Sequence, residues 1–144
     1  MQGRKIGMEL KQLEQMFRRC VDRELSEGIC RDITRMQSFV IRFLVENQDK
    51  GDLFQRDVEK QFGIRRATAT GILQVMERDG LLCREPVQYD ARLKKLTLTP
   101  KAARMDEQIV RSIQTMEEQT MEGVSPADEE VFWRVFDQMK KNLE

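Results

Sequence analysis

The chain has 144 residues, of which 40% are hydrophobic and 35% are charged, and its mean hydropathy is −0.60. This composition is typical of one globular domain made of amphipathic helices and excludes a disordered chain; since no run of about 18 apolar residues occurs, we expect no membrane-spanning helix. The formal net charge is zero because a basic segment, 55–104, with 11 Lys/Arg against 6 Asp/Glu, balances an acidic one, 105–144, with 4 against 10, while residues 1–54 have 10 against 9.

The first part of the chain predicts two amphipathic helices. Apolar residues recur at helical spacing over 8–27, and Gly28 follows as a natural helix end. A second helix is expected to begin near Asp32 or Thr34 and to end before a turn at 49–52. The buried stripe of this second helix is expected to consist of Met36, Phe39, Val40, Phe43 and Leu44.

Two short helices joined by a tight turn come next, and their spacing is that of a helix-turn-helix. The first is expected at about 53–62, where Asp52 and Gln55 resemble a capping box and Gly63 breaks the helix. The second is expected at about 66–79 and ends at a glycine. The inward-facing residues of the second helix are expected to be Ala69, Ile72, Leu73 and Met76.

The period then changes from helical to alternating. A strand is expected at 81–85, a loop at 86–91 and a second strand at 93–99, where Leu96-Thr97-Leu98-Thr99 alternates apolar and polar residues. Two strands directly after the second helix of a helix-turn-helix make a β-hairpin wing.

Two further helices close the chain. Thr99 followed by Pro100 predicts the start of a long helix to about residue 121, and Ser125 followed by Pro126 predicts the start of the last helix. We therefore expect a mainly α fold with a small β-hairpin wing, as one domain over 1–144. Its winged-helix lobe is expected at about 32–99 and its dimerisation helices at about 1–29 and 100–144. The first and last helices have apolar stripes that are most simply buried against a second copy of the chain, so we expect a homodimer. A compact monomer in which these helices pack on the lobe is the alternative.

The second helix of a helix-turn-helix enters the major groove with its N-terminal end first. Arg pairs bidentately with guanine, and Thr contacts a thymine methyl group or a phosphate. Cations at a helix N-terminus oppose the helix dipole, so Arg65 and Arg66 indicate a function other than local stability. The candidate DNA-binding residues of this helix are Arg65, Arg66, Thr68, Ala69, Thr70 and Gln74.

The wing contributes a second basic set. An Arg at the tip of a wing can enter a narrow minor groove, and Asp90 lies two residues before Arg92, where it can hold the Arg92 side chain or the turn. An ordinary hairpin with charged edges is the alternative, because Lys on edge strands also prevents aggregation. The candidate DNA-binding residues of the wing are Arg84, Asp90, Arg92 and Lys94.

These motifs resemble the MarR family of bacterial transcriptional regulators over nearly the whole chain. Thr68 and Thr70 match the Thr-x-Thr of its recognition helix, residues 77–84 match its Glu-Lys-x-Gly-Leu-Ile-x-Arg, and Asp90-Ala-Arg92 matches its wing-tip Asp-x-Arg. Two departures affect the base contacts. Arg65 stands where the family has an N-cap Ser or Asp, and Gly71 stands where a polar or basic residue follows the second Thr.

The resemblance implies a homodimeric repressor that binds a palindromic operator on double-stranded DNA and is released by a signal. In many members of the family this signal is a small-molecule effector, or oxidation of a cysteine, in the cleft between the dimer helices and the DNA-binding lobe. Cysteine sensing is an alternative to an effector here, because Cys20 follows two arginines and Cys30 precedes one. Free cysteines are more often small buried hydrophobes.

Other functional classes are less well supported by the residues. The chain has no histidine, its three cysteines lack Cys-x-x-Cys spacing, and no phosphate loop or nucleophile–base pair is present. We therefore expect no metal, no cofactor and no enzymatic activity. The N-terminus is charged throughout and lacks the apolar stretch of a signal peptide, which predicts a cytoplasmic protein. A winged-helix protein-interaction module is the alternative to a DNA-binding regulator.

Overall fold

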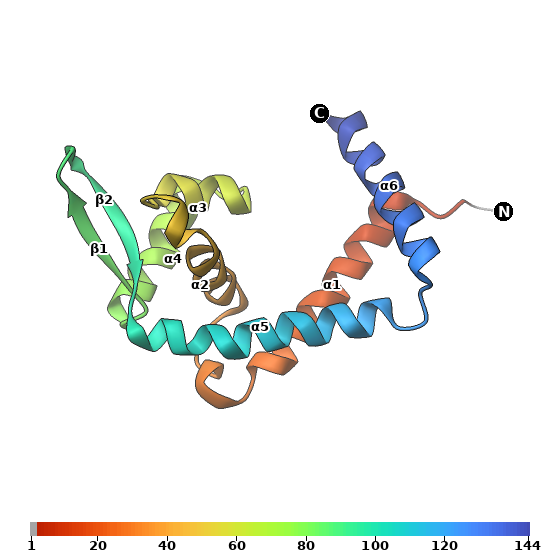
Figure 1. Ribbon diagram of the computed structural model, residues 1–144, viewed down its shortest axis with the longest axis horizontal. Helices are drawn as coiled ribbons and strands as arrows, with labels where there is room; N and C mark the ends of the chain where they lie inside the picture. The colour runs from red at the N-terminus through yellow and green to blue at the C-terminus, as the bar shows by residue number, and fades with distance from the viewer. Residues whose placement is uncertain (1–2) are drawn as a thin grey trace.

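In the computed structural model, which describes residues 3–144, a long helix joins two groups of elements (Figure 1). A winged lobe of three helices and one hairpin lies at one end, and the first and last helices, with both chain termini, lie at the other. The expected fold class, mainly α with a small β-hairpin, is confirmed. The elements are α1 (Ile6–Leu25), the 3-10 turn η1 (Gly28–Cys30), α2 (Arg35–Asn47), the 3-10 turn η2 (Gln48–Lys50), α3 (Gln55–Phe62), α4 (Arg66–Arg78), β1 (Leu82–Val87), β2 (Asp90–Leu98), α5 (Pro100–Met121) and α6 (Pro126–Leu143).

The hydrophobic core lies in the winged lobe and on the adjoining face of α5. α1 contributes only Val21 and Leu25, near its C-terminal end, and α6 contributes no buried residue. Each large aliphatic side chain that is fully buried stabilises the fold by about 1.5–3 kcal/mol, so most of the stability of one chain resides in the lobe. The fully buried members include Val40, Ile41, Val58, Leu73, Met76, Leu81, Leu82 and Ile109.

Side-chain caps decide where three helices begin. Thr34 and Gln37 form a capping box, in which Gln37 N donates to Thr34 Oγ1 at 3.1 Å and Thr34 N donates to Gln37 Oε1 at 2.9 Å. α2 therefore begins after Thr34, the second of the two expected starting points. Thr99 and Ser125 cap α5 and α6 as expected, each followed by a proline at the first helical position.

The expected cap of α3 is wrong. Phe54, which is buried, occupies the N-cap position, and the backbone N–H of Phe54 donates to Asp57 Oδ2 at 2.8 Å. Asp52 lies too far from the helix start to cap it, and instead accepts a hydrogen bond from the Tyr89 hydroxyl at 3.0 Å. Burial of the apolar side chain of Phe54 stabilises a helix start at Gln55, although Asp52 has the better capping side chain.

The hairpin is longer and its turn shorter than expected. The strands pair antiparallel from Leu82 opposite Leu98 to Pro86 opposite Lys94, and only Gln88 and Tyr89 form the turn. Val87 then pairs with Asp90, so three residues of β2, 91–93, have no partner on β1 and form a bulge near the tip. Proline is tolerated in this position because a two-stranded sheet consists only of edge strands.

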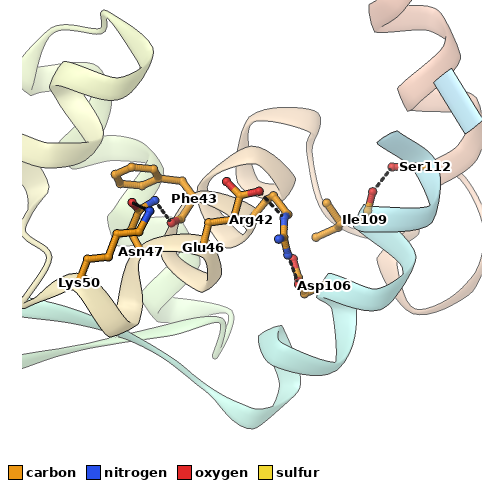
Figure 2. Close-up of polar contacts among 8 residues, drawn as sticks. All are labelled: Arg42, Phe43, Glu46, Asn47, Lys50, Asp106, Ile109 and Ser112. Carbon is orange, nitrogen blue, oxygen red and sulfur yellow. Dashed lines mark hydrogen bonds and ion pairs between the residues drawn. The ribbon is translucent and has the colours of Figure 1, made fainter. Parts of the chain in front are cut away.

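A charged joint fixes the winged lobe on α5 (Figure 2). Arg42 of α2 donates through Nη1 to Asp106 Oδ2 of α5 at 2.5 Å, and its Nε donates to Glu46 Oε1 at 3.0 Å. Asp106 is only 9% exposed, and its other oxygen, Oδ1, has no hydrogen-bond partner within residues 3–144. Burial raises the pKa of Asp106 and the nearby Arg42 opposes this rise.

A second joint holds the end of α1 against α5. The Gln108 amide donates to the backbone oxygens of Glu24 at 3.2 Å and Glu27 at 2.7 Å, and Cys30 N donates to Gln108 Oε1 at 3.3 Å. The lobe, α1 and α5 are therefore held together by polar contacts as well as by the core.

Among the described residues, no helix has an apolar stretch long enough to cross a bilayer.

Candidate nucleic-acid interface

The turn between α3 and α4 is built by a glycine in the left-handed region. Gly63 has φ +58°, and the following residue, Ile64, donates its N–H to Glu59 O at 3.1 Å, so α3 ends there as expected. α4 then begins at Arg66. Arg65 is its N-cap residue and provides no side-chain hydrogen bond to the helix start. Two arginines thus lie at the positive end of the α4 dipole, where they are locally unfavourable by about 0.3–1 kcal/mol each.

The predicted residues of α4 differ in exposure. Arg65, Arg66, Thr68 and Gln74 are exposed, and Thr70 is half-buried. Ala69 is 0% exposed and packs in the interior of the lobe. Its predicted inward-facing position is therefore confirmed, and its predicted DNA contact is wrong. The helix period explains the difference, because position 69 shares a face with the buried Leu73 and Met76.

The wing tip holds one arginine outward. The Arg92 side chain is 90% exposed, yet it is braced: its backbone N–H donates to Asp90 Oδ1 at 2.9 Å and its Nε donates to the same oxygen at 3.2 Å. Hydrogen bonds from the Arg92 side chain and backbone lower the pKa of Asp90. An exposed ion pair of this kind adds little stability. Its effect is to orient the Arg92 guanidinium before any partner arrives.

A hollow of about 550 Å³ lies between α3, α4 and the wing, and we call it the cationic groove. Its lining includes five cations, from four elements, and one carboxylate, that of Glu59. The potential of such a hollow is positive, and low-dielectric walls concentrate it. The cations are Arg56, Arg66, Arg84, Arg92 and Lys94.

Arg84 lies deeper in the cationic groove than its neighbours. Its side chain is 26% exposed, and its Nε is 3.5 Å from Glu77 Oε2 of α4. Its Nη2 is buried and has no hydrogen-bond partner within the described part of the chain. Lys94 is exposed and lines the groove, whereas the neighbouring Lys95 turns toward Asp52, at 3.8 Å.

Two residues of α3 that sequence reasoning missed also line the cationic groove. Arg56 lies over the ring of Phe54 at 4.9 Å from its centroid, and Gln55 donates through Nε2 to Thr70 Oγ1 at 2.9 Å and to Arg66 O at 3.3 Å. The position of Arg56 in the basic segment was a usable signal. No sequence signal pointed to Gln55, because its partner Thr70 is 15 residues away.

The three cysteines have different environments. Cys30 is buried, with Sγ 3.5 Å from Met105 O, and burial raises the pKa of its thiol. Cys20 is half-buried with Sγ 3.5 Å from Gln119 Oε1, and Cys83 is exposed on β1. A raised pKa keeps Cys30 in the thiol form, which is the less reactive one. Within residues 3–144, no three Cys, Asp or Glu side chains gather as a metal site would require.

Comparison with known proteins agrees with the resemblance of the sequence motifs. Residues 31–93 match the model of the MarR family. The fold is similar to that of the transcription regulator MarR from Oenococcus oeni PSU-1, with 28% identity, a TM-score of 0.76, and 95% of this chain and 99% of that chain covered. It is also similar to S. aureus MepR, solved in complex with DNA, with 21% identity, a TM-score of 0.86 and 97% of each chain covered. Streptococcus pneumoniae FabT, also solved with DNA, has 21% identity, a TM-score of 0.81, and 96% of this chain and 94% of that chain covered.

Proposed function

This chain belongs to the MarR family through its winged-helix segment, residues 31–93, and from this premise we propose that it is a transcriptional regulator that binds double-stranded DNA through α4 and the wing. The cationic groove is the observation that carries the proposal. Five cations face one carboxylate there, and the outermost, Arg92, is exposed and already oriented by Asp90. This is the electrostatic arrangement that a phosphate backbone requires.

In this proposal the N-terminal end of α4 lies in the major groove. Its exposed side chains there reach base edges and flanking phosphates, with Arg66 placed to pair with guanine. Arg92 enters the adjacent minor groove, and Lys94 and Arg84 contact phosphates. The α4 residues that act are Arg65, Arg66, Thr68, Thr70 and Gln74, all of them exposed or half-buried.

Binding to DNA fragments across a salt series tests this proposal. If Arg56, Arg84, Arg92 and Lys94 of each protomer each neutralise one phosphate charge, a dimer neutralises about eight, and the slope of log K against log salt is about −7. Arg92→Ala is expected to weaken binding to all sequences and to reduce the slope by about 2 per dimer. Arg66→Ala is expected to cost roughly 1–3 kcal/mol and to relax specificity.

Arg78→Ala is the matched control, because Arg78 is an exposed arginine at the opposite end of α4. It is expected to leave affinity and slope unchanged. An affinity for DNA that does not depend on salt would contradict the proposal and leave the alternative of a protein-interaction module.

We further propose that the chain is a homodimer through α1, α5 and α6, with residues 1–29 and 100–144 as its dimerisation helices. The support is a large apolar surface that one chain leaves uncovered. Three aromatic rings on α6, of Phe132, Trp133 and Phe136, lie together with centroids 5.0–6.0 Å apart, although α6 has no buried residue. The exposed apolar residues of α1 are Ile6, Met8, Leu10, Leu13 and Met16, and those of α6 include Val131, Phe132, Trp133, Val135 and Leu143.

The oligomeric state and the single tryptophan test the dimer together. Trp133 is 47% exposed in one chain, so dimerisation through α6 is expected to move its fluorescence emission to shorter wavelength as it leaves water. Val135→Glu places a charge in this surface and is expected to give a monomer by sedimentation, with the emission shifted back. Gln138→Glu, on the same helix but at a polar position, is the control. A monomer in the unmodified protein would refute this part of the proposal.

A two-fold dimer implies an operator with two inverted half-sites, one helical turn of DNA or a multiple of it apart. We propose that the protein represses transcription from such a site by covering it. Selection from a random DNA library is expected to return an inverted repeat, and transcription in vitro from a promoter that carries it is expected to fall when the protein is added. Recovery of single, unpaired half-sites would contradict the dimeric reading.

Release by a small ligand is the last part of the proposal. A hollow of about 500 Å³ lies where the end of α1 meets the start of α2, and the ion pair from Arg35 Nη1 to Asp22, 2.9 Å long, forms part of its wall. A ligand bound there would contact both α1 and α2 and so change the angle between the winged lobe and α1. Ser26→Trp fills the rim of the hollow and is expected to lower operator affinity, whereas Ser26→Ala is not. Equal affinities of the two variants would argue against coupling at this hollow.

A further inference from the structure

The cationic groove contains one hydrogen-bonded contact between the two helices of the helix-turn-helix that involves a proposed base-reading residue. Gln55, the first residue of α3, donates through Nε2 to Thr70 Oγ1 at 2.9 Å and to Arg66 O at 3.3 Å. Gln55 and Thr70 are both half-buried, so water competes with the contact only from one side. Arg66 O is the carbonyl four residues before Thr70, to which a helical threonine hydroxyl commonly donates.

This contact restricts the side chain of Thr70. A threonine in a helix divides between two χ1 rotamers, which place its hydroxyl and its methyl group at different staggered positions. The Gln55 amide draws the hydroxyl oxygen toward α3, and so selects the rotamer in which the methyl group points away from Gln55. Thr70 then presents a methyl group, rather than a hydroxyl, to a partner in front of α4.

The neighbouring residues make this restriction specific to Thr70. Thr68 is exposed, and its hydroxyl has no hydrogen bond among those formed within residues 3–144, so no such contact selects its rotamer. Gly71 has no side chain, and apart from its chain neighbours and the backbone of its own helix no atom lies within 4 Å of the place that a Cβ would occupy. The residue that follows Thr70 therefore has no side chain that could stand between Thr70 and a partner.

We propose that Gln55 is a positioning residue that makes Thr70 read the C5-methyl group of a thymine in the operator. The inference rests on the proposed DNA-binding function and deepens it, because it assigns a base to one side chain. A methyl–methyl contact distinguishes thymine from uracil, which has the same hydrogen-bonding edge and lacks the methyl group. Burying one such group corresponds to about a fourfold change in affinity.

The test uses an operator selected with the unmodified protein, in which each thymine is replaced in turn by deoxyuridine. At one thymine per half-site the replacement is expected to weaken binding about fourfold. Thr70→Ser lacks the methyl group and is expected to bind both operators equally. Thr70→Val keeps a methyl group in either rotamer position and is expected to retain the fourfold preference.

Gln55 is tested by removal and rescue. Gln55→Ala releases Thr70 to both rotamers, and with equal populations of the two the preference for thymine over uracil at that position is expected to fall from about fourfold to about 2.5-fold. The double variant Gln55→Ala, Thr70→Val is expected to recover it, because valine needs no hydrogen bond to place a methyl group there. A purely structural role of Gln55 would not be rescued in this way. Gln61→Ala, an exposed glutamine on the same helix, is the control.

The outcomes separate this inference from the function beneath it. If the unmodified protein selects no operator, the proposed function fails. If it selects an operator but no uracil replacement weakens binding, or if Thr70→Ser keeps the preference, the inference is wrong and the function stands. A Gln55→Ala variant with an unchanged preference would overturn the positioning role alone.

Discussion

Replacing Arg42 with methionine removes the cation that faces the buried carboxylate of Asp106 and keeps most of the apolar stem. The loss of one partner from a fully buried ion pair costs about 3–5 kcal/mol, since the other charge stays buried alone. Arg42 is 26% exposed, so water can partly replace it, and we expect a loss of roughly 2–3 kcal/mol in the free energy of unfolding. Asp106→Asn is expected to cost less, about 1 kcal/mol, because Arg42 keeps Glu46 and an amide oxygen.

The stability deficit of Arg42→Met is also expected to depend on pH, in a direction that the pKa of Asp106 determines. Burial raises the folded-state pKa of Asp106 above its ordinary value of 3.8. A raised carboxyl pKa favours the protonated form in the folded state, so this contribution to stability is present below pH 3.8 and is lost as the pH rises through the folded-state pKa. Without Arg42 the pKa rises further. The deficit of Arg42→Met should therefore be largest at neutral pH and shrink toward pH 4.

Urea unfolding followed by circular dichroism, at one protein concentration and at several pH values, measures both quantities. The concentration must be held constant because dimerisation adds to apparent stability. Arg78→Met is the matched control: its ion pair with Asp79 is exposed, and its loss should change stability by less than about 0.5 kcal/mol. An Arg42→Met variant as stable as the parent at pH 7, or one whose deficit grows on acidification, would refute the reasoning.

Three further predictions concern the backbone, a cap and the thiols. Gly28→Ala should lower the free energy of unfolding, measured by thermal denaturation, by at least about 1 kcal/mol, because Gly28 has φ +70° and an added Cβ would lie 2.8 Å from Gln108 Oε1. Gly51→Ala is the comparison, since Gly51 also has a positive φ but an added Cβ there would meet no neighbouring atom. Thr34→Ala should lower the free energy of unfolding by about 1 kcal/mol through loss of the capping box, whereas Thr34→Ser should keep most of that stability. Equal stability of the two variants would show that the Thr34 hydroxyl does not stabilise the start of α2. Cys83 should react quickly with a thiol reagent in the folded protein and Cys30 only on unfolding, because Cys83 is exposed while Cys30 is buried with a raised pKa; rapid labelling of Cys30, read by mass spectrometry, would contradict its burial.

Much of the fold could be predicted because its signals are local. Apolar spacing identified the helices, and the glycine after α3 ended it in the left-handed conformation, with φ +58°. Thr99 followed by Pro100 marked the start of α5, since cap chemistry depends on neighbours three residues apart. The basic character of 55–104 is likewise a property of the amino-acid sequence alone, and five of its cations do line one groove.

Prediction failed where packing decided between local preferences. Asp52 has the sequence signature of a cap, but the burial of Phe54 moves the start of α3 past it. Ala69 fits two roles by its sequence position, and the rotation of α4 against the core excludes DNA contact. The hairpin turn was expected to be a loop of six residues, and strand pairing reduces it to two.

The sequence by itself determined the order of elements, the helix-turn-helix with its wing, and the residue types available to contact DNA. Only the tertiary structure decided which of these residues work together. Gln55 meets Thr70 across 15 residues and Arg42 meets Asp106 across 64. No periodicity or cap rule reaches over such separations, because the partner of a polar side chain is set by how the helices pack and not by its own neighbours in the chain.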